Sequence, residues 1–137
     1  MRKTRIQKKK VVRVILLNEN IEMLLVRQKT RQLWQFPGGI ISTKESALRA
    51  AQRELREETN IRLSRLKPIN TETVLTAVVE EVIYCYVGRV SQTKSMTPDG
   101  KEIDKLAWVK MQQSFDLPLT DTTKVLLYNL SIIELFI

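Results

Sequence analysis

The sequence predicts a single α/β domain in which helices cover both faces of a β-sheet. Its 137 residues suit one hydrophobic core, and its 43% apolar and 28% charged residues are typical of a globular protein. The order of the predicted elements is strands, a long amphipathic helix, more strands and a closing helix. No internal repeat or interdomain linker interrupts this order, so we expect one folding unit.

Two short aliphatic runs near the start of the chain predict a β-hairpin. Residues 11–17 and 21–26 flank Asn18-Glu19-Asn20, a turn-forming sequence. The segment Trp34-Gln35-Phe36-Pro37-Gly38-Gly39 then breaks the strand pattern, and we expect a loop there. Its paired glycines allow a sharp turn and a close approach of the backbone to a ligand.

The following segment, residues 42–59, predicts an amphipathic helix. Ser42 and Glu45 fit a capping box, in which each side chain bonds to the backbone of the other residue. Apolar residues recur behind them at helical spacing, at Ala47, Leu48, Ala51 and Leu55. We therefore expect the helix to begin at Ser42.

The second half of the chain predicts further strands and a closing helix. We expect strands over 71–79, 82–90 and 106–111, a turn at Glu80-Glu81, a surface loop over 91–101 and a helix over 122–136. Tyr84, Cys85 and Tyr86 alternate within one of these strands, and we assign them to packing.

The net charge of +8 is concentrated at the start of the chain. The first ten residues contain six Lys or Arg and no acid, whereas residues 11–137 contain 17 basic and 15 acidic side chains. We therefore interpret residues 1–10 as a basic tail and residues 11–137 as the domain. A solvated tail is the simplest interpretation, and contact with a polyanion such as RNA is the alternative.

The amino-acid counts exclude several kinds of site. The chain has no histidine and one cysteine, Cys85, which excludes Ser-His-Asp and Cys-His catalysis and an internal disulfide. Metal chemistry must therefore use oxygen ligands. No apolar run approaches the ~18 residues of a membrane span, and Arg13 breaks the run at 11–17. We expect a cytoplasmic protein without a membrane partner.

Three glutamates near the end of the predicted helix form a candidate metal site. Glu54, Glu57 and Glu58 are spaced to lie on one helix face, where they repel one another. The helix dipole also disfavours anions at that end, and a bound divalent cation would offset both penalties. The alternative is a solvated acidic face balanced by the arginines of the same helix, Arg49, Arg53 and Arg56.

The spacing of these residues resembles the signature of the Nudix hydrolases, G-x5-E-x7-R-E-U-x-E-E-x-G-U, where U is aliphatic. The matching residues are Gly39, Glu45, Arg53, Glu54, Leu55, Glu57, Glu58 and Ile61. The one departure is Asn60 in place of glycine. That position follows the helix end, where a left-handed backbone is expected, and asparagine tolerates this conformation best after glycine.

The resemblance implies an α/β/α sandwich with a mixed β-sheet and an enzyme that hydrolyses phosphoanhydride bonds. It implies that Glu54, Glu57 and Glu58 bind Mg²⁺ or Mn²⁺ and bridge it to a substrate diphosphate. Arg53 would hold Glu57 from one turn away, Glu45 would support the metal site, and Glu54 is the first candidate for the general base.

Outside the signature, the chain resembles the MutT-type branch, which converts nucleoside triphosphates to monophosphates and pyrophosphate. The resemblance implies that Arg27 contacts phosphates and that Glu102 is a further metal ligand or an alternative base. Asp121 falls where the branch reads the base edge, although it is equally placed to cap the last helix. Trp34 could stack on a base or belong to the core.

The resemblance leaves the substrate and the assembly open. An RNA 5′ end is the main alternative, because Trp34-Gln35-Phe36-Pro37 followed by two glycines is similar to RNA 5′-end pyrophosphohydrolases. ADP-ribose and dinucleoside polyphosphates fit the motifs less well. Either a monomer or a homodimer is compatible with the sequence.

Overall fold

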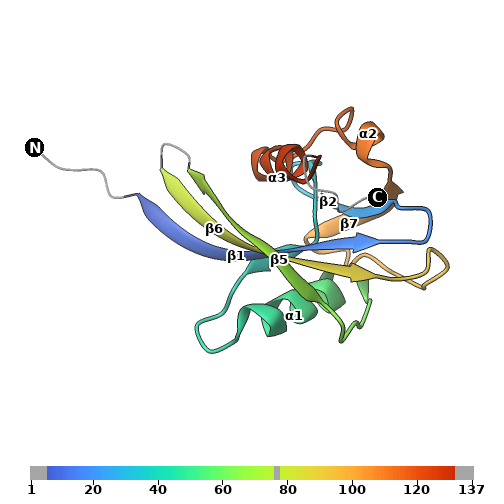
Figure 1. The fold of residues 1–137 in the computed structure, drawn as a ribbon, viewed down its shortest axis with the longest axis horizontal. Helices are drawn as coiled ribbons and strands as arrows, with labels where there is room; N and C mark the ends of the chain where they lie inside the picture. The colour runs from blue at the N-terminus through green and yellow to red at the C-terminus, as the bar shows by residue number, and fades with distance from the viewer. Residues whose placement is uncertain (1–5, 76–77, 132–137) are drawn as a thin grey trace, which may run out of the picture.

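The computed structural model describes residues 6–75 and 78–131, which form a twisted sheet between two helical layers. Figure 1 shows helix α1 (Ala47–Thr59) on one face of the sheet, and α3 (Asp121–Ser131) with the short α2 (Met111–Ser114) on the other. The α/β/α sandwich predicted from the sequence is therefore confirmed.

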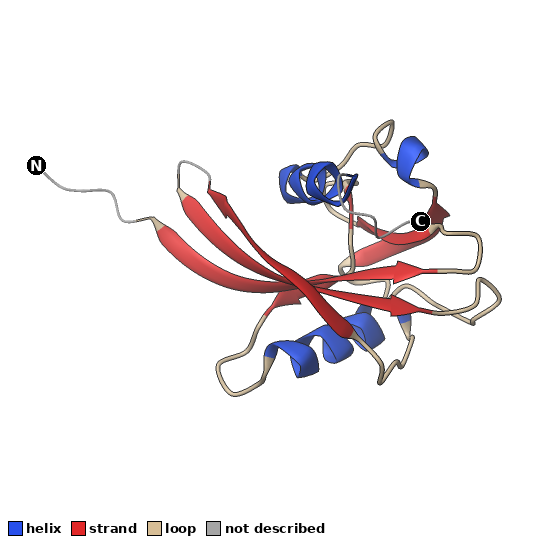
Figure 2. Cartoon of the chain, in the orientation of Figure 1, coloured by secondary structure: helices blue, strands red, loops and turns tan. Residues whose placement is uncertain are grey.

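Seven strands form the sheet, in the order β3-β2-β1-β6-β5, with β4 paired to β1 and β7 paired to β2. Their bounds are β1 Gln7–Leu17, β2 Met23–Gln28, β3 Trp34–Gln35, β4 Gly38–Ile40, β5 Lys67–Leu75, β6 Val79–Arg89 and β7 Ile103–Val109. Strands β1 and β6 run parallel and the other pairs are antiparallel, so the sheet is mixed. Figure 2 shows β1, β5 and β6 extending beyond the helices at one end.

The central strand β1 separates two hydrophobic clusters because its side chains alternate between the faces of the sheet. Val12, Val14 and Leu16 pack with Ala51 and Leu55 of α1. On the opposite face, Ile15 and Leu17 pack in a second cluster that includes Leu126, Leu127 and Leu130 of α3. These residues are buried, so both helical layers are fixed to the sheet by apolar contact.

Several predicted boundaries in the first half of the chain are wrong. Strand β1 begins at Gln7 and not at Val11, so 7–10 of the predicted tail are strand residues, while 1–5 lie outside the described residues. The predicted loop at 34–39 contains the short strands β3 and β4, which β2 and β1 hold in the sheet. Pairing to neighbouring strands, rather than local propensity, decides both differences.

In the second half of the chain, the predicted turn at Glu80-Glu81 is also wrong. Both residues lie within β6, where they pair in register with Lys8 and Lys9 of β1. The closing helix begins at Asp121 and is described to Ser131, and the end predicted for it lies outside the described residues. Among the residues described, no helix is long and apolar enough to cross a membrane.

Candidate active site

Helix α1 carries the signature residues and has defined ends. Its N-cap is Ser46, whose side chain accepts a hydrogen bond from the Arg49 amide, so the predicted start at Ser42 is wrong. Asn60 ends the helix at φ 62°, in the left-handed conformation expected from the sequence. Ala50, Ala51 and Leu55 are buried. Glu58 and Thr59 of the same helix are also buried, so the packing of α1 takes one of the candidate metal ligands out of solvent.

The carboxylates predicted to bind metal line one cavity. Glu54, Glu57 and Glu58 line a space of about 440 Å³ together with Asp99, Lys101 and Glu102. Glu102 is remote from the signature in sequence, and the structure brings it to the other three glutamates. Asp99, which was not among the site residues predicted from the sequence, also lines the cavity.

The loop that supplies Glu102 is held by hydrogen bonds to the Asp99 side chain and to the backbone of Lys29. Asp99 Oδ1 accepts from the amides of Lys101 (2.9 Å), Glu102 (3.1 Å) and Ile103 (2.9 Å). The Lys29 amide donates to the Glu102 carbonyl oxygen at 2.8 Å. Pro98-Asp99-Gly100 is a turn sequence, and this is the signal in the sequence that could have identified Asp99.

Glu58 is the most deeply buried carboxylate of the site, with 2% of the residue exposed. Its Oε1 accepts a hydrogen bond from the Gly38 amide at 2.7 Å. Burial raises the pKa of Glu58 to about 8, to which the negative charges of Glu54 and Glu102 also contribute. Burial similarly raises the pKa of Glu54. A bound cation would stabilise the ionised form of both carboxylates.

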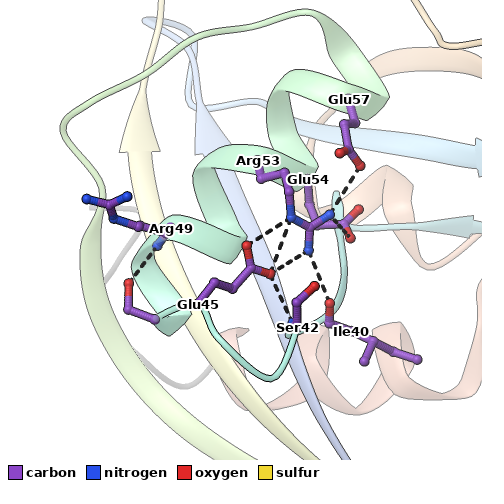
Figure 3. Close-up of polar contacts among 8 residues, drawn as sticks. Ile40, Ser42, Glu45, Arg49, Arg53, Glu54 and Glu57 are labelled. Carbon is purple, nitrogen blue, oxygen red and sulfur yellow. Dashed lines mark hydrogen bonds and ion pairs between the residues drawn. The ribbon is translucent and has the colours of Figure 1, made fainter.

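Arg53 joins three glutamates of the site. Its guanidinium donates to Glu45 (2.7 Å from Nη2), Glu54 (3.0 Å from Nη1) and Glu57 (3.2 Å from Nη1), as Figure 3 shows. The contact with Glu57 agrees with the spacing of one helical turn. Glu45 does not cap the helix as predicted; it faces Arg53 and also accepts from the Ser42 amide at 3.0 Å.

Gly38 and the signature residue Gly39 each lie in close contact with another part of the site. A Cβ atom on Gly38 would collide with the carbonyl oxygen of Val12 in β1. A Cβ on Gly39 would lie 2.5 Å from Oε1 of Glu54. A side chain at position 38 would displace the backbone of β1, so glycine is required there on steric grounds. A side chain at position 39 would require only that the end of the Glu54 side chain move, which would shift a candidate metal ligand.

The chemistry of the donor atoms, though not their present arrangement, suits a hard divalent cation. Four glutamates of one cavity offer carboxylate oxygens, the ligands that Mg²⁺ prefers. In the described part of the chain, no three acidic side chains are arranged around one point as metal ligands. Glu54 and Glu57 instead face Arg53, and Glu58 faces the Gly38 amide.

The structure gives two of the predicted substrate residues other partners. Arg27 of β2 forms a two-pronged ion pair with Asp104 of β7, at 2.9 and 2.7 Å. A phosphate contact for Arg27 stays a prediction. Trp34 is half-buried and packs against the cluster on the α3 side, while its amide donates to the Pro118 carbonyl oxygen.

A second cavity, of about 250 Å³, lies on the α3 side of the sheet and holds Asp121. Asp121 is the first residue of α3 and its side chain is 92% exposed. Its alternative role as helix cap is wrong: Thr120 accepts the hydrogen bond from the Thr123 amide. Sequence reasoning missed the other polar residues that line this cavity, among them Arg13, Gln28, Gln35 and Glu81.

Arg13 lines the second cavity and interacts electrostatically with glutamates of both cavities. Its Nη1 donates to the Phe36 carbonyl oxygen at 3.1 Å, and its Nε is buried without a hydrogen-bond partner among the described residues. Burial lowers the pKa of Arg13, while the charges of Glu58, Glu81 and Glu54 oppose this shift. A cation inside an otherwise aliphatic strand is the sequence signal that could have identified this residue.

Comparisons with known proteins agree with this geometry. The family model of the NUDIX domain matches residues 7–129. A Bacillus subtilis (strain 168) protein provisionally named 8-oxo-dGTP diphosphatase is 34% identical over 96 residues, which cover 70% of this chain and 62% of that protein. The RNA pyrophosphohydrolase of Francisella philomiragia is 41% identical over 51 residues, covering 37% of this chain and 33% of that protein.

Among solved structures, the crystal structure of the MutT protein from Methanosarcina mazei Go1 has a TM-score of 0.81 with this chain. The two chains are 19% identical, and the match covers 94% of this chain and 96% of the other. The chain spans less than two thirds of the length of the two curated relatives. The chain belongs to the Nudix family, and its resemblance is to the MutT-like members, as the sequence predicted.

Proposed function

We propose that this protein is a Mg²⁺-dependent pyrophosphohydrolase that cleaves nucleoside di- or triphosphates. With a triphosphate and water as substrates, the products are a nucleoside monophosphate and pyrophosphate. The observation that carries this proposal is the meeting of Glu102 with Glu54, Glu57 and Glu58 in one cavity. A solvated acidic helix face, the alternative to a metal site, does not explain why a separate loop brings a fourth carboxylate to the same cavity.

Glu54, Glu57, Glu58 and Glu102 are the residues that would hold the metal. Bound Mg²⁺, or Mn²⁺ in its place, supplies neutralisation of phosphate charge and lowers the pKa of a water molecule. The protein's own contribution is to fix the carboxylates. The Gly38 amide holds Glu58, and Arg53 holds Glu54 and Glu57.

Glu54 is our first candidate for the general base, with Glu102 as the alternative. The raised pKa of Glu54 brings the carboxylate nearer to the operating pH, which suits proton transfer. Gly39 leaves the space in which this carboxylate lies. Arg53 acts as a positioning residue, because its guanidinium contacts the carboxylates rather than any reacting atom.

The second cavity supports a nucleotide as substrate. Its volume of about 250 Å³ would hold several water molecules at about 30 Å³ each, so it has room for a heterocyclic base. Arg13 and the side-chain amides offer hydrogen-bond donors, and Glu81 and Asp121 offer acceptors. The name of the Bacillus subtilis relative also supports a nucleoside triphosphate.

An RNA 5′ end is the second candidate substrate. The Francisella philomiragia relative supports it by name, and it would be cleaved by the same chemistry at the same carboxylates. Lys8, Lys9 and Lys10 give the start of β1 a basic character that suits a polyanion.

The test is pyrophosphate release by the purified full chain, with Mg²⁺ and with EDTA. The panel comprises nucleoside triphosphates, ADP-ribose, a dinucleoside polyphosphate and 5′-triphosphorylated RNA. Glu54→Gln and Glu57→Gln should each reduce turnover by at least ~10²-fold while the fold survives, because a ligand or base is lost. Glu80→Gln, which removes a carboxylate outside the cavity, is the matched control. Turnover that persists in EDTA, or within tenfold in both site variants, would refute the assignment.

A further inference from the structure

The outer side of α1 carries a group of arginines, of which the proposed reaction uses only Arg53. Arg49, Arg53, Arg56 and Arg62 line a surface hollow of about 690 Å³, which we call the arginine groove. Three of them lie on α1 itself, spread over about 10 Å of helix at 1.5 Å per residue. Arg62 comes from the segment that follows the helix, and Gln52 holds that segment through the Ser64 carbonyl oxygen at 3.3 Å.

Only Arg53 of these four arginines is neutralised by glutamates. Within the described residues, the side chains of Arg49, Arg56 and Arg62 form no ion pair, and all three are exposed. Figure 3 shows the guanidinium of Arg49 pointing away from Glu45 and Arg53. Of the three arginines expected to balance the acidic face, Arg53 alone forms ion pairs with it among the described residues. The charges of Arg49 and Arg56 remain available to a ligand.

The groove adjoins the carboxylate cavity at Arg53, although no described residue lines both. Arg53 lines the groove, and its Nη1 lies 3.0 Å from Glu54 and 3.2 Å from Glu57. A ligand with its terminal phosphates at the carboxylates could therefore extend into the groove. A free nucleotide has no further phosphates to place there, whereas a nucleic-acid strand does.

We propose that the arginine groove binds the phosphodiester backbone of a single-stranded RNA whose 5′ phosphates lie at the carboxylate site. This rests on the proposed function and selects the RNA 5′ end as a substrate. Arginine is the side chain best suited to phosphate, which it contacts through two parallel hydrogen bonds. None of the described residues that line the groove is an aromatic residue on which a base could stack. Binding is therefore through the backbone and independent of base sequence.

The test compares one triple variant, Arg49→Gln, Arg56→Gln and Arg62→Gln, with the unaltered chain. Glutamine keeps the helix propensity close to that of arginine, so α1 is preserved. On 5′-triphosphorylated RNA, we expect kcat/KM to fall at least tenfold, chiefly through KM. On a nucleoside triphosphate, kcat/KM should stay within twofold. Arg89→Gln, at the exposed end of β6, is the matched control and should change neither.

A binding measurement separates this proposal from the proposed reaction. Fluorescence anisotropy with labelled single-stranded RNA, without metal and across a salt series, needs no turnover. Loss of three phosphate contacts should weaken binding and reduce the log–log salt slope by about 2. Two results would overturn the proposed RNA binding by the groove. One is an equal loss of kcat/KM on RNA and on the nucleoside triphosphate, and the other is unchanged RNA binding in the triple variant. If the unaltered chain binds RNA through the groove but does not hydrolyse it, the proposed reaction is refuted and the RNA-binding proposal stands.

Discussion

Arg53 and Glu45 form the shortest contact of the arginine at the site, with 2.7 Å between Nη2 and Oε1. The pair ties the turn before α1 to the middle of the helix. The same guanidinium contacts Glu54 and Glu57. The position of two candidate metal ligands therefore depends on an ion pair outside the carboxylate cavity.

Arg53→Lys should lower Mg²⁺-dependent turnover by about 10–100-fold, as expected for a residue that orients metal ligands. Lysine keeps the charge, but its single ammonium lacks the planar fork that reaches Glu45, Glu54 and Glu57 together. Arg56→Lys is the matched control, because it lies on the same helix without an ion pair among the described residues. Equal losses in nucleotide turnover in the two variants would show that the effect is not specific to the carboxylate contacts.

Glu45→Gln should remove an acid-sensitive part of the stability. The hydrogen bond from Arg53, with further help from Ser42, lowers the pKa of Glu45 from 4.5 to about 2. The ion pair therefore stabilises the fold fully above pH 4.5, and this contribution is lost as the pH falls toward 2. Denaturant unfolding should find the variant less stable than the unaltered protein at pH 7, with the difference closing by pH 2 to 3. A difference independent of pH would contradict the assignment.

Glu58→Gln should stabilise the metal-free protein at alkaline pH while abolishing turnover. Burial raises the pKa of Glu58 to about 8, so its contribution to stability is complete below pH 4.5 and lost as the pH rises through 8. Glutamine keeps an acceptor for the Gly38 amide and carries no charge. In EDTA at pH 9, we expect its Tm to exceed that of the unaltered protein by roughly 3 °C or more.

The same pair of proteins tests the metal assignment of Glu58. Added Mg²⁺ should raise the Tm of the unaltered protein, since a ligand that binds only the folded state stabilises it. The variant should respond less, because one carboxylate ligand is missing. Identical Mg²⁺ responses would exclude Glu58 from the site, whatever the Tm values in EDTA.

Cys85 should be unreactive in the folded protein. The residue is 4% exposed, and burial raises the pKa of its thiol to about 12, so the thiolate that reacts with disulfide reagents is scarce at pH 8. Labelling with a chromogenic disulfide should require denaturant, and its rate should follow unfolding. Rapid labelling of the native protein at pH 8 would contradict the packing assigned to this strand.

Much of this protein is readable from local sequence. The residues from Gly39 to Ile61 combine fixed spacing with helical periodicity, so they predict the helix, its acidic face and its left-handed end at Asn60. The hairpin of β1 and β2 is equally local, because a short polar turn joins two aliphatic runs. Composition by itself, with no histidine and a single cysteine, restricts the metal chemistry to oxygen ligands.

Tertiary structure decides the features that depend on residues far apart in the chain. Only the folded chain places Glu102 beside Glu54, turns Glu45 from a helix cap into a partner of Arg53, and groups Arg13 with Glu81. The same holds for β4, which is held by register with β1 rather than by its own propensity. Spacing along a chain fixes which side chains share a helix face, whereas burial, ion pairs and cavities depend on what packs against that face.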